Sequence, residues 1–426
     1  MLLLVFLLFL GLMAIGFDVG LSMVGAAALG MWLSVERPTD LVMVPLTMAT
    51  GMDSAALVTV PLFILAGELM NQGGLTQRLI DWSFAMVGHL RGALSQVAIV
   101  TNLIMAGVSG SAVADAAATG GLLIPAMRKE GYDEGYAGAV IAAGALLGPI
   151  IPPSIPMIVY AVMANQSVIK LFLAGVVPGI LLAAGYMAIC AVIARRRGYA
   201  ARPRVAWRGR LAATRSSFWA LLMPVIILVG MRYGLVTDNE AAAVAAVYAL
   251  VVGVGIYREI RGRALALAFV TAARGSAVIL FLLAAAGPFG WLLAEARIND
   301  AVAALVLAQT HDPVVGLLLI NAALLVIGCF IEPLPAMIIF LPALIPVGGA
   351  LGIDPIHLGT VMVINLMIGM LTPPVGLLLF VVAAVGKVPL GAVIRAVLPF
   401  LGWSVIVLVL ITLWPPLVTF LPNLGG

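Results

Sequence analysis

Charged residues are scarce in this sequence, and their scarcity excludes most classes of soluble protein. Only 9% of the 426 residues are charged, whereas 64% are hydrophobic, and the mean hydropathy is +1.21. A surface that faces water needs far more charge, so the composition indicates an integral membrane protein. The net charge of +4 is concentrated in two arginine-rich segments, and we therefore expect a lipid environment and no nucleic-acid partner.

Cysteine and histidine are also rare, which argues against metal sites, disulfides and many enzymes. The two cysteines, Cys190 and Cys329, lie in apolar runs, and none of the three histidines has a partner at ligand spacing. No metalloprotease, serine-hydrolase or phosphate-loop motif occurs. We therefore expect no enzyme and no ATP-driven pump, so an ion gradient or a partner protein must supply energy.

Apolar runs make up most of the chain, and many have the length of one membrane-spanning helix. They lie near residues 2–16, 19–34, 57–71, 97–127, 137–163, 168–194, 217–235, 241–257, 276–294, 314–347, 357–386 and 392–418. The runs 97–127 and 314–347 exceed thirty residues and are interrupted by small or polar residues, which predicts two re-entrant hairpins. The first residues lack a basic leader and a cleavage site, so we expect a retained span.

Two amphipathic segments and one basic loop divide these runs. Residues 75–92 and 258–275 mix arginines with apolar residues at helical spacing, which predicts helices along the membrane surface. Eight arginines and no acid lie between Arg195 and Arg215. This charge predicts a cytoplasmic loop, with phosphate or lipid binding as the alternative.

The resulting domain prediction has five parts. We expect scaffold spans and a surface arm helix at 1–96, the first hairpin and broken helix with the following span at 97–194, the arginine loop at 195–216, scaffold spans and arm helices at 217–312, and the second hairpin and broken helix with the C-terminal span at 313–426.

The two halves of the chain match at an offset of 221 positions without a gap. The matched pairs are Gly107 and Gly328, Pro125 and Pro346, Gly131 and Gly352, Asp133 and Asp354, Gly138 and Gly359, Gly148 and Gly369, Pro152-Pro153 and Pro373-Pro374, and Pro178 and Pro399. Such a match predicts an internal repeat. With both arginine-rich segments cytoplasmic, the hairpins open from opposite sides, so the predicted fold is an all-α polytopic membrane protein with inverted repeats, a transporter architecture.

A Pro-Pro pair interrupts an apolar run in each half, in "GPIIPPSIPMIVY" and "MLTPPVGLLLF". Proline removes one helical hydrogen bond and frees the carbonyl four residues earlier. The carbonyls expected to be free are those of Gly148, Pro149, Gly369 and Met370. A hard cation or water would satisfy them, while the new half-helices, from Ser154–Ile155 and near Val375–Gly376, would face an anion. A simple proline kink is the alternative.

The first hairpin tip, "MAGVSGSAVADAAATGG", is rich in hydroxyl groups and small residues. Ser109, Gly110 and Ser111 form the expected turn, and Asp115 follows one helical turn later. Hydroxyl and carbonyl oxygens are suitable ligands for a hard cation such as Na⁺. Close helix packing through small residues is the alternative reason for this composition.

The second tip, "LLVIGCFIEPLPAMII", places Glu332 at the position that matches Ser111. A carboxylate at membrane depth is costly and is therefore a functional candidate. Its alternative roles are to cap a half-helix or to pair with Arg297 or another charge. Glu68 lies near an expected helix end, where a structural role is the simpler interpretation.

Five segments together resemble the large membrane subunit of tripartite ATP-independent periplasmic (TRAP) transporters, over nearly the whole chain. They read "VPLFILAGELMNQGG", "VGHLRGALSQV", "GVSGSAVADAAATG", "GPIIPPSIPMIVY" and "MLTPPVGLLLF". The resemblance to this DctM-like permease implies Na⁺-coupled uptake of an organic acid, such as a C4-dicarboxylate or sialic acid, across a prokaryotic inner membrane. It also implies an elevator-type movement, a periplasmic binding protein that delivers the carboxylate, and a small four-helix membrane subunit.

The resemblance further implies site residues. For Na⁺ they are Ser109, Gly110, Ser111, Gly148 and Pro152 in the first repeat, and Gly328, Glu332, Gly369, Thr372 and Pro373 in the second. For the substrate carboxylate they are Ser154, Asp115, Val375 and Gly376. Because the chain begins with the first span of the large subunit, we expect the small subunit to be a separate polypeptide.

Two other functions remain open from the sequence. One is a stand-alone symporter for dicarboxylates coupled to Na⁺ or H⁺, or an ion antiporter of related fold, which would need no binding protein. The other is a channel or a structural membrane scaffold. The residues do not select one organic acid.

Overall fold

The predicted all-α class is confirmed in the computed structural model, which describes residues 2–33 and 41–424. Within these residues every regular element is a helix. Residue 34, where the predicted run 19–34 ends, lies outside the described part. Seven helices of the described chain are long and apolar enough to cross a membrane.

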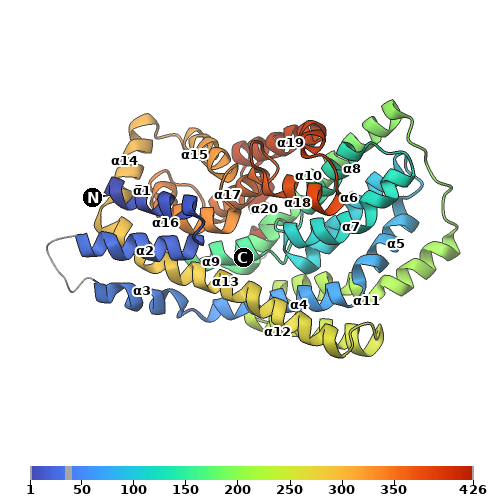
Figure 1. Ribbon diagram of the computed structural model, residues 1–426, viewed down its shortest axis with the longest axis horizontal. Coiled ribbons are helices and arrows are strands. Elements are labelled where there is room, and N and C mark those ends of the chain that lie inside the picture. The colour runs from blue at the N-terminus through green and yellow to red at the C-terminus, as the bar shows by residue number, and fades with distance from the viewer. Residues whose placement is uncertain (1, 34–40, 425–426) are drawn as a thin grey trace.

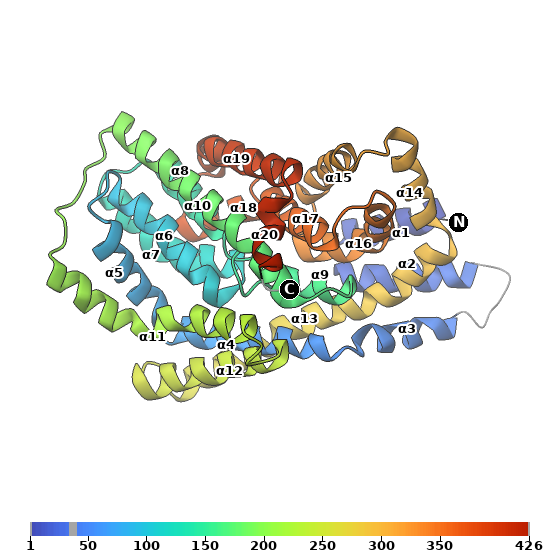
Figure 2. The ribbon, with the colours of Figure 1, turned by 180° about the vertical axis from the view of Figure 1, so that it is seen from behind.

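Within the described residues, nine α-helices lie outside the two hairpin units and form an outer group. They are α1 (Leu2–Ile15), α2 (Val19–Leu33), α3 (Met43–Met52), α4 (Thr59–Gln72), α5 (Leu75–Val87), α11 (Trp207–Arg232), α12 (Asp238–Leu250), α13 (Gly262–Glu295) and α14 (Ile298–Gln309). A short 3₁₀ turn, Ala55–Val58, precedes α4, and a π-helical turn, Val251–Ile256, extends α12. Helices α3, α4, α11, α12 and α13 run along the lower edge of the molecule in both views (Figures 1 and 2).

The remaining helices form an inner group with the same succession of elements in each half. They are α6 (Ala93–Ser109), α7 (Ala112–Lys129), α8 (Glu134–Ala145), α9 (Ile155–Met163) and α10 (Val168–Arg197), then α15 (Pro313–Gly328), α16 (Pro333–Ala350), α17 (Pro355–Gly369), α18 (Leu377–Gly386), α19 (Leu390–Leu413) and α20 (Pro416–Asn423). Each half therefore has a helical hairpin, an interrupted helix and a long helix. Both predicted interruptions are confirmed, whereas the opposite membrane orientation of the halves stays a prediction.

The prediction of a separate surface helix at 258–275 is wrong. Helix α13 begins at Gly262 and continues without a break to Glu295, a length of 34 residues. Gly275 and Ser276 do not end it, because one helical glycine costs only about 1 kcal/mol and the Ser276 hydroxyl donates to the Ala272 carbonyl at 2.7 Å. The sequence analysis also missed α3 and α14, which are short and lie between stronger apolar runs.

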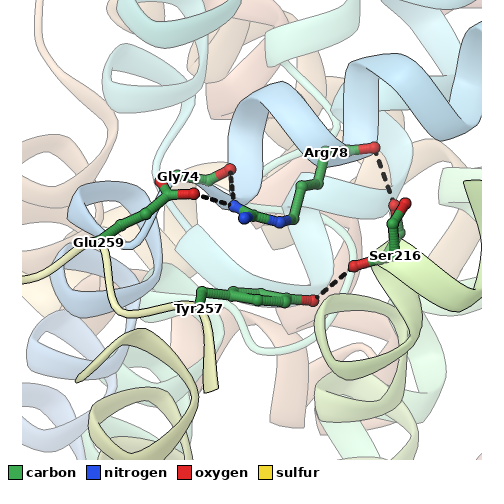
Figure 3. Close-up of polar contacts among 6 residues, drawn as sticks. Gly74, Arg78, Ser216, Tyr257 and Glu259 are labelled. Carbon is green, nitrogen blue, oxygen red and sulfur yellow. Dashed lines mark hydrogen bonds and ion pairs between the residues drawn. The ribbon is translucent and has the colours of Figure 1, made fainter. Parts of the chain in front are cut away.

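Helix α5 is fastened to α11 and to the segment after α12 by one polar cluster (Figure 3). The Arg78 guanidinium pairs with Glu259, donates to the Gly74 carbonyl at 3.2 Å and lies 4.0 Å from the centre of the Tyr257 ring. The Tyr257 hydroxyl in turn donates to the Ser216 carbonyl on α11 at 3.0 Å. One arginine thus joins three segments that are far apart in the sequence.

We expect Arg78→Gln to loosen α5, because it removes the ion pair and the cation–π contact together. Partly exposed contacts of these kinds contribute about 1 kcal/mol in sum, which corresponds to about fivefold faster hydrogen exchange of the α5 amides. Hydrogen exchange with mass spectrometry measures this. Arg263→Gln, an exposed arginine in the first turn of α13, is the control, and equal exchange in both variants would contradict the prediction.

Candidate functional site

The tip of the first hairpin packs directly on the first helix interruption. Gly110 has a φ of +60°, and a Cβ atom there would lie 2.7 Å from the Pro153 carbonyl oxygen. A Cβ atom on Gly148 would lie 2.6 Å from Asp115 Oδ2 and 3.3 Å from the Ser111 carbonyl carbon. The two glycines therefore permit a contact that any side chain would prevent.

Asp115 is completely buried at this contact, on the first turn of α7. Its Oδ1 accepts a hydrogen bond from the Ser109 hydroxyl at 2.5 Å, whereas its Oδ2 has no hydrogen-bond partner among the described residues. The sequence analysis grouped Asp115 with the substrate residues. The structure places it beside Ser109 and Gly148, two residues predicted to bind Na⁺. A buried carboxylate with a free oxygen is a strong ligand for a cation, because burial without a counter-charge is costly.

The second tip meets the second interruption in the same way. A Cβ atom on Gly369 would lie 2.5 Å from the Gly328 carbonyl carbon, and one on Gly328 would lie 3.3 Å from the Gly369 Cα atom. The Gly376 amide donates to the Cys329 carbonyl at 3.5 Å. Thr372 donates its hydroxyl to the Ile368 carbonyl at 2.8 Å, so the lone pairs of its oxygen remain available.

Three of the four carbonyls that were expected to be free have donors inside the protein, so the prediction is wrong for these three. Ser154 Oγ donates to the Pro149 carbonyl, the Thr372 amide to Gly369 at 2.9 Å and the Leu378 amide to Met370 at 3.1 Å. The prolines remove the regular helical donors, and local turns replace them. A carbonyl oxygen has two lone pairs, so each of these groups can still bind a cation.

The predicted starts of both half-helices are confirmed. Helix α9 begins at Ile155, and its N-cap Ser154 accepts a hydrogen bond from the Met157 amide at 3.3 Å. Helix α18 begins at Leu377 after Gly376, which has a φ of +57°. Ser154 is completely buried, and its hydroxyl is used within the break.

Two adjacent cavities lie where the hairpin tips approach the outer helices. The first, which we name the α4-side cavity, has a volume of about 230 Å³ and contains Ser109, Asp115 and Glu68 in its lining. The second, the intertip cavity, has a volume of about 300 Å³ and extends from Ser111 to Glu332. Both share Ser111, Ile155, Gly275 and Ile279, so α13 forms a common wall.

Some predicted residues lie at these cavities and others do not. Ser109, Gly110, Ser111, Asp115 and Glu332 line one or both cavities, whereas Gly148, Pro152, Ser154, Gly328, Gly369, Thr372, Pro373, Val375 and Gly376 are not among the lining residues. Most of the latter belong to the two interruptions.

Neither predicted structural role for Glu332 is found. It is the N-cap residue of α16, but its side chain makes no capping hydrogen bond, and it forms no ion pair with Arg297 or any other described residue. Its carboxylate is therefore available at the intertip cavity.

The sequence analysis missed the contribution of α4 and α13 to the site. Asn71 and Thr76 from the α4–α5 region, and Thr271 and Gly275 from α13, line the α4-side cavity. Thr271 and Gly275 lie four residues apart, on one face of a helix. This spacing was the indication in the sequence that α13 contributes to the site. Their approach to the first hairpin tip depends on tertiary packing between segments more than 150 positions apart.

Comparisons with known proteins agree with this architecture. The model of the family described as "Tripartite ATP-independent periplasmic transporter, DctM component" matches residues 6–417. The large permease protein of the sialic acid TRAP transporter of Vibrio cholerae is 38% identical, with 97% of each chain covered. The large permease protein DctM of the C4-dicarboxylate TRAP transporter of Pseudomonas aeruginosa is 41% identical, with 87% of each chain covered.

A solved structure supports the fold alone. The YdaH transporter of Alcanivorax borkumensis superimposes with a TM-score of 0.67 at 16% sequence identity, over 93% of this chain and 96% of that one.

The structure combines paired hairpins with interrupted helices around a buried acid, and the chain is strongly apolar. These features define a membrane transporter rather than an enzyme. The chain belongs to the DctM component family of the tripartite ATP-independent periplasmic transporters. It is a multi-pass protein of the inner membrane.

We expect Gly369→Ala to destabilise the protein, because the added methyl group would meet the Gly328 backbone. Overpacking of this kind costs about 1–3 kcal/mol, which a lower melting temperature in detergent would report. Gly349→Ala is the matched control, since a Cβ atom at Gly349 in α16 has no neighbour within 4 Å. Equal melting temperatures for both variants would show that the tip and the interruption are not in tight contact.

Proposed function

We propose that this chain is the large permease subunit of a system that takes up an organic acid by coupling it to Na⁺ entry. The observation that carries the proposal is the buried Asp115 carboxylate, which holds the Ser109 hydroxyl on one oxygen and has a free second oxygen. A cation at this position would offset a charge that the described protein groups leave uncompensated. Na⁺ fits because the Ser109 hydroxyl, the Asp115 carboxylate and the backbone carbonyls of the interruption are oxygen ligands.

The two proposed Na⁺ sites combine a hairpin tip with an interruption. The first contains Ser109, Gly110, Ser111, Gly148 and Pro152, to which we add Asp115. The second contains Gly328, Glu332, Gly369, Thr372 and Pro373. Tight glycine contacts join tip and interruption in each pair, so a bound cation would hold both elements in one arrangement.

The substrate carboxylate would bind near the start of a helix. The N-termini of α7 and α9 both reach the intertip cavity, through Ser111–Val113 and Ile155. The positive end of the helix dipole and the free amides of a first turn favour an anion there. No lysine, arginine or histidine lines either cavity among the described residues, so helix ends and Na⁺ would supply the positive charge. Ser154 lies next to Ile155, and Val375 and Gly376 belong to the corresponding start of α18.

We further propose an elevator-type movement of the inner group against the outer group. Both cavities lie between the hairpin tips and α13, which belongs to the outer group. A displacement along that boundary would carry a substrate held by the tips past a fixed wall. In this proposal the inner group would act as the transport domain and the outer group as the scaffold.

Two protein partners complete the proposed system: a small four-helix membrane subunit and a periplasmic binding protein. The family description and the names of the large permease relatives support this assembly. A stand-alone symporter remains the second candidate.

Na⁺ should raise the melting temperature of the purified permease more than K⁺ or choline at equal ionic strength. A ligand that binds only the folded state stabilises it by about 2.7 kcal/mol at a hundred times its Kd. We expect Ser109→Ala, Asp115→Asn and Thr372→Ala to reduce this Na⁺-specific increase. Differential scanning fluorimetry over a series of NaCl concentrations measures it.

Ser22→Ala serves as the control for these variants, because Ser22 is a buried serine on α2, outside both hairpins. It should keep the Na⁺ response of the parent. If the three site variants respond to Na⁺ as Ser22→Ala does, the proposed Na⁺ sites are wrong.

Uptake into proteoliposomes should require both partners. We expect radiolabelled organic acid to accumulate with an inward Na⁺ gradient only when the small subunit is co-reconstituted and the loaded binding protein is added outside. Accumulation by the large subunit alone would instead establish the stand-alone symporter.

A further inference from the structure

We infer that the substrate is a monocarboxylate with an apolar body, and that the intertip cavity holds this body. The inference rests on the proposed function and narrows its substrate class. The residues that line the cavity carry it, because each class of organic acid needs different binding groups.

Polar side chains are nearly absent from the intertip cavity. Ser111 and Glu332 are its only polar lining side chains within the described chain. An acid with many hydroxyl groups would lose its hydrogen bonds to water and find few partners here. Polyhydroxylated acids are therefore poorly matched to the cavity.

Proline removes further donors from the same wall. Four lining residues, Pro149, Pro156, Pro333 and Pro335, have no backbone N–H group. The first-turn amides of Ala112 and Val113 remain, which is enough for one carboxylate. The cavity can thus bind one anionic group at the start of α7 and offers little to a second polar group.

The remaining walls are apolar and come from three helices and the second interruption. They are formed by Val278, Ile279 and Leu282 of α13, Leu334 of α16, Met367 of α17, and Met370 in the interruption after it. Such surfaces favour alkyl groups, and the flexible methionines can adapt to their shape.

The fixed side-chain charges also disfavour a second carboxylate. Glu332 lines the intertip cavity, and Asp115 and Glu68 line the α4-side cavity, while no basic side chain lines either among the described residues. A dicarboxylate would place its second anionic group near acids without a protein cation to pair with it.

Three acids of equal carbon-chain length test the inference. Hexanoate carries one carboxylate and an alkyl chain, adipate adds a second carboxylate, and gluconate carries hydroxyl groups along the chain. We expect hexanoate to raise the melting temperature of the permease in NaCl at a concentration at least about tenfold lower than adipate or gluconate, since each methylene in an apolar pocket contributes about that factor. Equal or stronger effects of adipate or gluconate, or no effect of any acid in NaCl, would overturn the inference.

A matched pair of variants locates the binding. Val278 lines the cavity and is 56% exposed, whereas Val270 lies two turns earlier on α13, is 45% exposed and lines neither cavity. Val278→Thr replaces a methyl group with a hydroxyl of similar volume and should raise the half-maximal hexanoate concentration about fivefold, because a hydroxyl without a partner disfavours the apolar contact. Val270→Thr should not change it. An equal change in both variants would place hexanoate elsewhere, for instance in the detergent layer.

The increase in melting temperature with Na⁺, measured without any organic acid, distinguishes a failure of one proposal from a failure of the other. If Na⁺ stabilises the permease but adipate or gluconate binds best, the substrate inference fails and Na⁺ coupling stands. If hexanoate is preferred but Na⁺ acts no differently from K⁺, the coupling fails and the substrate inference stands.

Discussion

The site depends on one constraint: a helix interrupted within an apolar environment must find new partners for its backbone. Water is absent there, and an unpaired amide or carbonyl costs several kcal/mol. In this chain the partners come from local turns and from a hairpin tip packed on each interruption. The contact between Gly328 and Gly369, and that between Gly110 and Pro153, are close enough to exclude any side chain. Hairpin and interruption therefore form one unit in each half.

That arrangement leaves a site whose fixed side-chain charges have one sign. Asp115, Glu68 and Glu332 surround the two cavities, and no base lines either of them in the described chain. An organic anion entering alone would meet these acids and only the partial charges of helix ends. Under the proposed function, Na⁺ would reverse the local potential and so make anion binding depend on the cation. Such dependence is the thermodynamic basis of coupled transport.

The sequence was most informative where a residue type restricts the backbone. The two Pro-Pro pairs predicted both interruptions, and Ser154 and Gly376 correctly marked where the half-helices begin. Boundaries without such residues were less certain. The predicted surface helix 258–275 ended at Gly275, but the Ser276 hydroxyl bonds within α13 and the helix continues. The number of free carbonyls was overestimated. A proline shows which carbonyl loses its helical donor, but it does not show which new donor takes that place.

The site itself was only partly predictable, because much of its lining comes from distant segments. Ser109, Ser111 and Asp115 lie close together in the sequence and could be grouped by helical spacing. The partnership of Asp115 with Gly148 depends on how α7 packs against the interrupted helix. The contribution of α13 depends on packing between the two groups of helices, which the spacing of Thr271 and Gly275 does not by itself predict.

The unbroken course of α13 has a mechanical consequence. A hinge at Gly275 would have allowed the cavity wall to move with the hairpin tips. Instead one continuous helix carries the exposed start near Gly262 and the wall residues Val278 and Leu282. The Arg78 cluster fastens the preceding segment to α5 and α11. The wall therefore belongs to the outer group, and under the proposed movement a shift of the tips along it would change which α13 side chains face the substrate. The apolar side chains of α13 would then contact the substrate along its path as well as at the binding site.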